Sequence, residues 1–417
     1  MKSIIKLLEI KALRMFMRVL YIFPIHNNRI IFNAYRGSQY SCNPRYISET
    51  LLSLYHNEFE VIWAFNRPED FSDLKRQGIK LVKYNSLKRF YYEATSKVSI
   101  NNIGSFSWIP LRKGQEHVNT WHSGLDLECC GMNEHANDKI MRYTIEMSGK
   151  ETSLFLAANR VFSDYSVKVQ FGYYGAILNC GLPRGDSLLN EKYDRIRKEV
   201  RRKLGIIGDT KVLMYAPTWR YGGKDAMPKM DLSRLATAMQ KRFGEKICVW
   251  NRSHHLTGEM FVAQSEYIKD VTKYPDVEEL VIACDILVSD YSSIIWDGAL
   301  AQKTIIQYAP DADTFEKDRG LYVPVGKWCL PLAKSMDGLC KEVDKLDMEL
   351  GKRNSQKLLK MMGSFETGKA AEICCDWIAW KCNCETRHIF EQYFSKFQGP
   401  IDDSLLKEMR LHGEPNR

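Results

Sequence analysis

The sequence predicts an α/β protein built from parallel, doubly wound sheets. Short runs of β-branched and aromatic residues alternate with helical stretches along most of the chain, and 417 residues are enough for more than one such sheet. Hydrophobic residues make up 45% and charged residues 27% of the chain, a globular balance that excludes a disordered protein. We therefore expect two Rossmann-like domains.

The first predicted sheet begins at residue 29. Its strands are expected at 29–35, 60–65, 79–84, 97–102 and 117–122, with helices at 44–55 and 87–95. The runs are short, apolar and β-branched, as in strands that are buried on both faces.

A second series of strands and helices follows. Strands are expected at 153–159, 176–181, 211–217, 246–251, 284–289 and 304–309, and helices at 164–171, 231–243, 277–283 and 293–301. The charged stretch 190–210 predicts a surface helix and the boundary between the domains, 366–395 a helical region and 398–417 a polar tail. The expected domains are 28–195 and 196–370, followed by a C-terminal helix and tail at 371–417.

Residues 1–27 form a separate opening segment. Basic side chains interrupt an apolar run in its first 23 residues, no signal-peptide cleavage site is visible, and the longest uncharged stretch, 19–28, is too short to span a bilayer. This composition predicts an amphipathic helix at an anionic membrane surface. The alternative is a first helix packed on its domain.

The net charge and the cysteine content indicate which partners and which cellular compartment to expect. The net charge of +9 favours an anionic partner, but the basic residues do not form the aromatic-interleaved stripe of a nucleic-acid-binding module. Twelve cysteines in so long a chain indicate reduced thiols. We expect a peripheral protein on the cytoplasmic face of the membrane that binds no nucleic acid.

Polar motifs follow several predicted strands, where doubly wound sheets bind their ligands. In SDYSSIIWDGAL, Ser292 and Ser293 stand at a predicted helix N-terminus suited to phosphate, and Ser289 or Asp290 could instead simply cap that helix. In HVNTWHSG, His122 ends a strand and suits a general base, with a structural histidine as the alternative.

Basic residues dominate the other motifs. They are Thr218 and Arg220 in YAPTWRYGG, Arg252 and His254 in VWNRSHHL, Arg184 in GLPRGD, and Arg319 in FEKDRGLY. Guanidinium groups fit phosphate oxygens, and surface arginines or a packed histidine pair are the alternatives. Because P-loop glycines, a G-x-G-x-x-G motif and paired catalytic carboxylates are missing, the pattern favours a nucleotide-diphosphate transferase over an ATPase.

In this order and spacing, the motifs resemble those of the CDP-glycerol glycerophosphotransferase family over about residues 28–385. The resemblance rests on RIIFNAYRGSQYSCNP, NTWHSG, GLPRGD, YAPTWR, the R-x-H of Arg252 and His254, SDYSSIIWD and RGLY. It implies a glycosyltransferase-B-like pair of Rossmann-like domains that face each other, with the acceptor on the N-terminal one and a CDP-alditol on the C-terminal one.

The resemblance also implies roles for residues. His122 would be the base and His254 a second catalytic residue at the diphosphate, which Ser292, Ser293 and Arg319 would help to hold. The other predicted donor-site residues are Arg252, Thr218, Arg220, Ser289, Asp290 and Arg184. The implied reaction transfers glycerol phosphate or ribitol phosphate from the CDP-alditol to a lipid-linked or glycan acceptor, with release of CMP, in teichoic-acid or capsule synthesis.

One segment departs from the family. Where relatives read WHGTPLKxLG this chain has WHSGLDLECCG, so that Ser123 replaces a glycine and Glu128 stands near an expected lysine. The acceptor, the choice between glycerol and ribitol, repeated transfer, a divalent metal and a homo-oligomer are left open, and no tightly bound cofactor or metal site is expected. The rival functions are a glycosyltransferase of the same fold that uses a nucleotide sugar and a non-catalytic membrane-bound scaffold.

Overall fold

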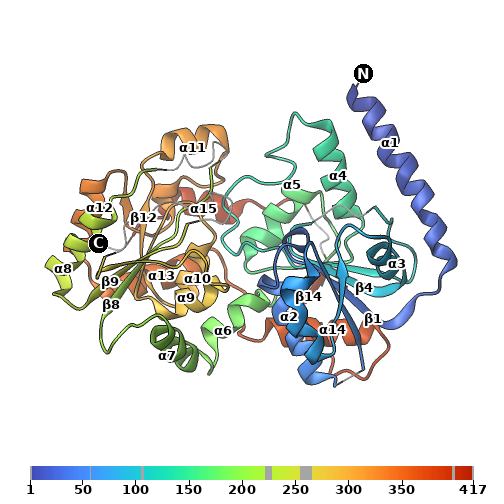
Figure 1. Ribbon diagram of the computed structural model, residues 1–417. Coiled ribbons are helices and arrows are strands. Elements are labelled where there is room, and N and C mark those ends of the chain that lie inside the picture. The colour runs from blue at the N-terminus through green and yellow to red at the C-terminus, as the bar shows by residue number, and fades with distance from the viewer. Residues whose placement is uncertain are drawn as a thin grey trace. The chain divides into compact units, whose positions relative to one another are not determined.

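The computed structural model describes residues 2–56, 58–104, 108–220, 228–253, 265–396 and 400–415. The chain divides into two compact units (Figure 1). Unit 1 comprises Met1–His122, Cys130–Asp186 and Phe365–Asp402, and unit 2 comprises Ser123–Cys129, Ser187–Ser364 and Asp403–Arg417. These boundaries differ from the predicted ones because the chain returns to unit 1 after residue 364 and then to unit 2 for its last segment.

Unit 1 is built on an eight-stranded sheet with the order β14-β7-β6-β5-β4-β1-β2-β3. The strands are β1 His26–Phe32, β2 Glu60–Phe65, β3 Lys80–Lys83, β4 Ser96–Asn101, β5 Glu116–Asn119, β6 Leu154–Leu156, β7 Ala176–Leu178 and β14 Phe394–Lys396. All pairs are parallel except β14 with β7. The order from β3 to β7 is that of a Rossmann sheet, as predicted.

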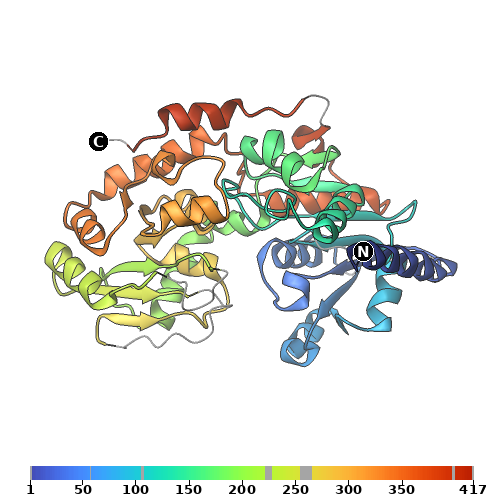
Figure 2. The same ribbon diagram turned by 90° about the horizontal axis from the view of Figure 1, so that it is seen from above.

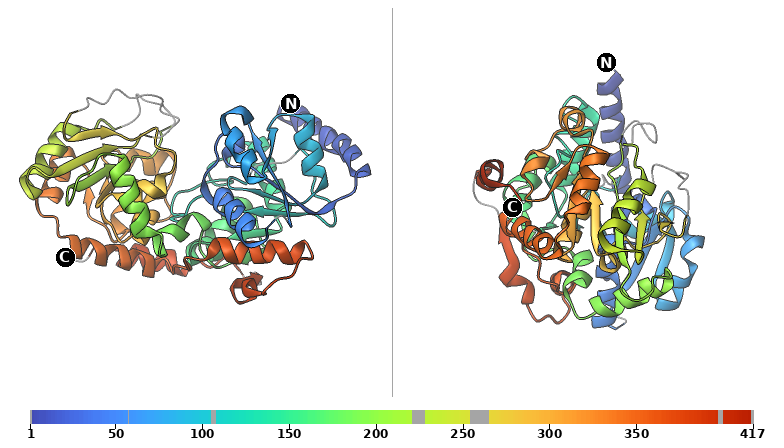
Figure 3. Two further views of the ribbon diagram at one scale, coloured as in Figure 1. Left: turned by 60° about the horizontal axis from the view of Figure 1, so that its bottom comes forward. Right: turned by 90° about the vertical axis from the view of Figure 1, so that its left-hand side faces the viewer.

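Helices cover both faces of this sheet (Figure 1). The α-helices of unit 1 include α1 Lys2–Met17, which packs on α4, and α2 Cys42–Leu54, α3 Leu87–Thr95, α4 Lys139–Lys150, α5 Val167–Phe171 and α14 Ala370–Lys381. The predicted helical region 366–395 is helical in α14 but is wrong at its end, where the chain pairs as β14. Helix α14 packs on α2, so a helix from late in the chain joins the helical layer on the sheet of unit 1 (Figure 3).

Unit 2 contains a six-stranded sheet with the order β10-β9-β8-β11-β12-β13. The strands are β8 Lys211–Tyr215, β9 Ile247–Asn251, β10 Ile268–Asp270, β11 Ile286–Ser289, β12 Thr304–Tyr308 and β13 Leu332–Ala333. All of their pairs are parallel. This is again the Rossmann order, so the prediction of two doubly wound domains is confirmed.

The helices of unit 2 include one that the sequence did not predict at the C-terminus. They are α7 Tyr193–Lys203, α8 Leu232–Phe243, α9 Val277–Ala283, α10 Ile294–Leu300, α11 Ala312–Asp318, α12 Met336–Asp344, α13 Met348–Met361 and α15 Ser404–His412. The predicted polar tail at 398–417 is wrong because α15 buries Leu406 and Met409. None of the helices within the described ranges has the length and apolar character to cross a membrane.

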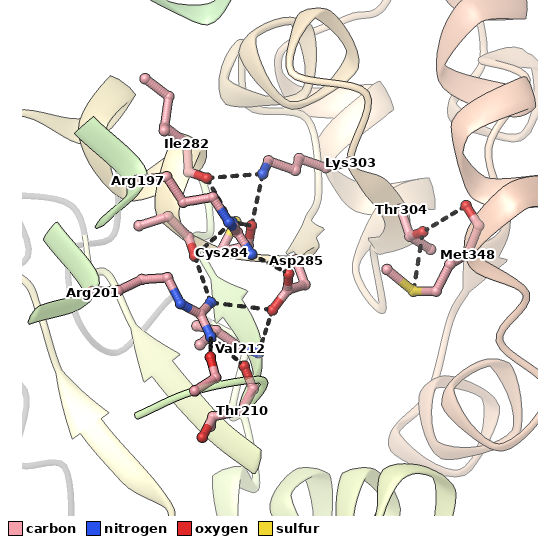
Figure 4. A network of polar contacts seen from close by, with 12 residues as sticks. Arg197, Arg201, Thr210, Val212, Ile282, Cys284, Asp285, Lys303, Thr304 and Met348 are labelled. Atoms are coloured by element: carbon pink, nitrogen blue, oxygen red, sulfur yellow. Dashed lines mark hydrogen bonds and ion pairs between the residues drawn. The ribbon is translucent and has the colours of Figure 1, made fainter. Parts of the chain in front are cut away.

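A buried cationic network fixes the start of β11 (Figure 4). Arg197 donates to the carbonyls of Ile282 and Cys284 at 2.8 and 2.9 Å, and Lys303 donates to the same two at 3.0 and 2.7 Å. Asp285 accepts a hydrogen bond from Arg197 at 2.5 Å. Positive charge at the C-terminal end of α9 complements the helix dipole, and the network holds in place the strand that leads into the SDYSS segment.

Candidate functional site

Each sheet has one point where the strand order reverses, between β1 and β4 in unit 1 and between β8 and β11 in unit 2. Ligands of doubly wound sheets bind outside the carboxyl ends of strands at such points. The predicted residues divide between the units: His122 and Arg184 lie in unit 1, and Thr218, Arg220, Arg252, Ser289, Asp290, Ser292, Ser293 and Arg319 lie in unit 2. His254 lies outside the described residues.

His122 is held in one tautomer. Its Nδ1 lies 2.8 Å from the backbone oxygen of Asn102, which can only accept, so Nδ1 carries the proton and Nε2 keeps a free lone pair. The imidazole lies beside Trp121 and against the edge of Tyr35, with ring centroids 4.3 and 5.7 Å away. Burial, with a smaller contribution from the charge of Arg184, lowers the pKa of His122 to about 4. The ring is therefore neutral at pH 7 and has the form of a general base.

Arg184 is buried close to this histidine, in the turn Pro183–Gly185. Its backbone N–H donates to Oδ1 of Asn43 at 3.0 Å, and Nδ2 of Asn43 donates to the backbone oxygen of Trp121 at 2.9 Å. Asn43 thus joins the GLPRGD turn to the residue before His122. Asn43 is not among the residues predicted for the site, although its SCNP motif was part of the family resemblance.

In unit 2, Asp290 bridges the two strands at the reversal point. Its Oδ1 accepts from the backbone N–H and hydroxyl of Thr218 at 2.8 and 2.6 Å and from the N–H of Tyr291 at 2.7 Å. Its Oδ2 accepts from Arg220 at 2.7 Å. Since Asp290 is 1% exposed, this carboxylate acts as the internal support of the site.

Arg220 is committed to the same support. Besides Asp290 it binds Asp311 through Nε at 2.8 Å. Its guanidinium carbon also lies 5.0 Å from the centroid of the Tyr291 ring and 4.9 Å from that of the Phe315 ring. Burial alone would lower the pKa of Arg220, but the two carboxylates outweigh it and raise the pKa. Its predicted contact with the donor stays a prediction, while the structure shows a buried ion pair.

The serines of the SDYSS segment differ in accessibility. Ser289 is fully buried and donates to the backbone oxygen of Ala216 at 2.6 Å. Ser292 and Ser293 are partly exposed just before α10, and Ser293 makes no side-chain capping bond. Two of the predicted serines can therefore meet a ligand, whereas Ser289 holds the loop.

The predicted donor-site arginines Arg252 and Arg319 also have protein partners. Nη1 of Arg252 donates to the backbone oxygens of Val271 at 2.9 Å, Tyr274 at 2.7 Å and, in a shorter contact, Thr272. Arg319 forms an ion pair with Glu128, the residue at which the sequence departs from its relatives. Glu128 therefore has a clear structural partner.

Residues 123–129 belong to unit 2 although they follow His122 directly. A Cβ atom on Gly124 would lie 2.1 Å from Cδ1 of Trp296, a residue of α10, so only glycine fits. The backbone N–H of Tyr322 donates to the oxygen of Leu127 at 2.8 Å, and Glu128 pairs with Leu321 as an antiparallel bridge. Residues 123–129 therefore pack beside α10, the helix that follows the SDYSS residues.

No cluster of three or more His, Cys, Asp or Glu side chains suited to a metal ion occurs within the described part of the chain. The family model for CDP-glycerol:poly(glycerophosphate) glycerophosphotransferases matches residues 15–379, most of the sequence. The chain belongs to this family. Its membership confirms the predicted resemblance and the predicted enzyme class, a CDP-alditol phosphotransferase of teichoic-acid-type synthesis.

Known members of the glycerophosphotransferase family match over long stretches. The teichoic acid poly(glycerol phosphate) polymerase of Bacillus spizizenii is 27% identical over 79% of this chain and 86% of its own length. The teichoic acid glycerol-phosphate transferase of Staphylococcus aureus is 25% identical over 85% of this chain and 93% of its own. Against two other polymerases, the chain spans 41% and 50% of the relative's length.

The fold has a solved counterpart. The wall teichoic acid polymerase TagF superposes with a TM-score of 0.75 at 23% identity, over 92% of this chain and 98% of the compared chain. At this identity the likeness concerns the fold, and it agrees with the two Rossmann-like sheets described above.

Proposed function

We propose that this glycerophosphotransferase moves glycerol phosphate or ribitol phosphate from a CDP-alditol to a hydroxyl group of a lipid-linked or glycan acceptor. The observation that supports it best is the tautomer of His122: in a chain of this family, a neutral imidazole with a free Nε2 is the group that an acceptor hydroxyl needs.

The proposed reaction is an in-line displacement at phosphorus. Nε2 of His122 takes the proton from the acceptor hydroxyl while its oxygen attacks the phosphorus that bears the alditol. The bond from that phosphorus to the bridging oxygen breaks, and CMP leaves with the bond's electrons. Ser292 and Ser293, with His254 and Arg319 as further donors, would stabilise the charge that grows on the diphosphate.

Released nucleotide tests this proposal. The full chain is incubated with a panel of CDP-glycerol, CDP-ribitol and nucleotide sugars in the presence of a lipid-linked acceptor, and the released nucleoside monophosphate or diphosphate is measured. We expect CMP from a CDP-alditol only. Product from a nucleotide sugar alone would favour the rival glycosyltransferase, and no donor binding at all would favour a scaffold.

A variant pair tests the base. His122→Ala should lower turnover by about 100-fold or more, the contribution of general base catalysis, and leave CDP-alditol binding largely intact. His135→Ala, which removes a partly exposed histidine of the same unit, should turn over like the wild type. Near-normal rates for His122→Ala would refute the assignment.

We further propose that α1 places the protein on the cytoplasmic face of an anionic membrane. One side of α1 buries Ile10 and Arg14, and Arg14 binds Glu151 at 2.5 Å. At about 100° per residue the opposite side is largely apolar and exposed. It carries Ile4, Ile5, Leu8, Met15 and Phe16, together with the acid Glu9. Exposed Lys6 and Lys11 flank this side, exposed Arg18 follows the helix, and all three suit lipid phosphates. Figure 2 shows α1, in dark blue, as a long helix at the edge of its unit.

Vesicle flotation separates this proposal from a purely structural helix. Replacement of exposed Leu8 and Phe16 by serine should reduce flotation with anionic vesicles, because the apolar area that enters the bilayer is lost. Ile207→Ser, which removes an exposed apolar side chain of unit 2, is the matched control. Equal flotation of all three proteins would refute membrane attachment through α1.

A further inference from the structure

The segment that follows β1 has an unusual backbone. Three successive residues, Tyr35, Arg36 and Gly37, have φ values of 47°, 54° and 79°. This left-handed region costs non-glycine residues of the order of 1–3 kcal/mol each and persists only where the surroundings impose it. The segment lies in the RIIFNAYRGSQYSCNP motif, to which the proposed function gives no role.

Neighbouring strands hold this segment in place. Oδ1 of Asn102 accepts from the backbone N–H of Tyr35 at 2.9 Å. Asn66 donates through Nδ2 to the oxygen of Arg36 at 3.1 Å and through its backbone N–H to the oxygen of Gly37 at 2.7 Å. Each of the three residues therefore has one backbone group bound by a residue at the carboxyl end of β4 or β2.

Asn102, which binds this segment, also binds the proposed base His122. Asn102 binds Tyr35 through its side chain and His122 through its backbone oxygen, 2.8 Å from Nδ1. The Tyr35 ring meets the imidazole edge-on with centroids 5.7 Å apart. Because β1 and β4 flank the reversal point of this sheet, the segment lies where a ligand of unit 1 is expected to bind.

Arg36 is the exposed residue of the segment. Its side chain makes no hydrogen bond, ion pair or ring contact with the described residues. Two other arginines of unit 1 differ: Arg29 of β1 binds Glu60 at 2.6 Å, and Arg89 of α3 binds Glu93 at 2.8 Å. A guanidinium that the fold presents beside the base, without an internal counter-ion, is suited to a phosphate group of a ligand.

We propose that Arg36 binds a phosphate group that the acceptor carries near its reactive hydroxyl. The inference rests on the proposed function, since each transfer leaves a chain end with a free hydroxyl at one side of the new alditol and a phosphodiester at the other. An acceptor that has already received one unit therefore brings an anion close to the base. Arg36 makes the enzyme prefer such acceptors to unphosphorylated ones.

Kinetics with paired acceptors test this preference. The probes are a lipid that bears a terminal glycerol phosphate and the same lipid that bears glycerol without phosphate, with CDP-glycerol as donor. Arg36→Gly removes the guanidinium and tolerates φ 54°, Arg36→Lys keeps a charge, and Arg76→Ala removes an exposed arginine elsewhere in unit 1.

Loss of a charged hydrogen bond should raise the KM of Arg36→Gly for the phosphorylated lipid by about 10- to 100-fold. The KM for the phosphate-free lipid and for CDP-glycerol should not change, Arg36→Lys should recover part of the loss, and Arg76→Ala should match the wild type. Equal effects on both lipids would overturn the proposal, and a raised KM for CDP-glycerol alone would place the arginine at the donor diphosphate instead.

A binding measurement keeps this inference separate from the proposed function. Titration of the full chain with sn-glycerol 3-phosphate, followed by calorimetry, should give weaker binding for Arg36→Gly than for the wild type. If the wild type releases no CMP from any CDP-alditol, the proposed function fails, and the titration still decides on Arg36. Equal binding by both proteins, with equal melting temperatures, would overturn the role of Arg36.

Discussion

Replacement of Arg220 by methionine distinguishes an internal support from a donor ligand. Methionine keeps much of the length of the side chain but removes the bonds to Asp290 at 2.7 Å, to Asp311 at 2.8 Å and to the backbone oxygen of Thr218 at 2.6 Å. The two carboxylates then differ, because the Asp290 side chain is 2% exposed and that of Asp311 is 27% exposed.

The exposures set the expected magnitude. Removal of one partner from a buried ion pair costs about 3–5 kcal/mol, since the other charge stays buried. Asp290 keeps hydrogen bonds from Thr218 and Tyr291, so the lower end, about 3 kcal/mol, is expected. Asp311→Asn, as the control, should cost about 1 kcal/mol, because water reaches that carboxylate.

Hydrogen exchange of β8 and β11 in the full chain, combined with urea titration, measures this loss where it arises. A chain with two units does not unfold as one two-state system, so a local readout is needed. The reasoning is refuted if Arg220→Met keeps wild-type protection within about 0.5 kcal/mol while the KM for the CDP-alditol rises tenfold. Arg220 would then be a donor ligand, as the sequence analysis predicted.

Two further perturbations test the packing of Gly124 and the burial of His117. Gly124→Ala should destabilise segment 123–129 by about 1–3 kcal/mol through its clash with Trp296, and a protease should cut this segment faster; unchanged cleavage would contradict the contact. Burial lowers the pKa values of both His117 and His122 to about 4, below the ordinary value of about 6.5, so the unfolded chain binds more protons between these values. The contribution of the two histidines to the free energy of unfolding is therefore full above pH 6.5 and should fall by about 1–3 kcal/mol per histidine as the pH drops toward 4. In acid denaturation, His117→Gln should lose stability less steeply than the wild type. If both proteins lose stability in parallel, His117 makes no such contribution.

Much of the secondary structure could be predicted because the strands are buried on both faces. Runs such as 60–65 and 304–309 are largely apolar and coincide closely with β2 and β12. Elements with a weak pattern were missed: β13 has two residues, β14 pairs at an edge, and α15 buries only Leu406 and Met409. Tertiary contacts stabilise these elements more than their own residues do.

By itself the sequence determined two Rossmann-like sheets, the family, and the positions after the strands where polar residues gather. Only the tertiary structure decided which protein groups those residues bind. The backbone oxygen of Asn102 selects the tautomer of His122, and Asp290 engages Arg220 across 70 residues of chain. Such pairings depend on the order of the strands in the sheet. Every residue has a backbone oxygen, so the sequence cannot indicate which one accepts the hydrogen bond. The sequence therefore indicates where the chemistry gathers, and the fold determines which groups are left to meet a ligand.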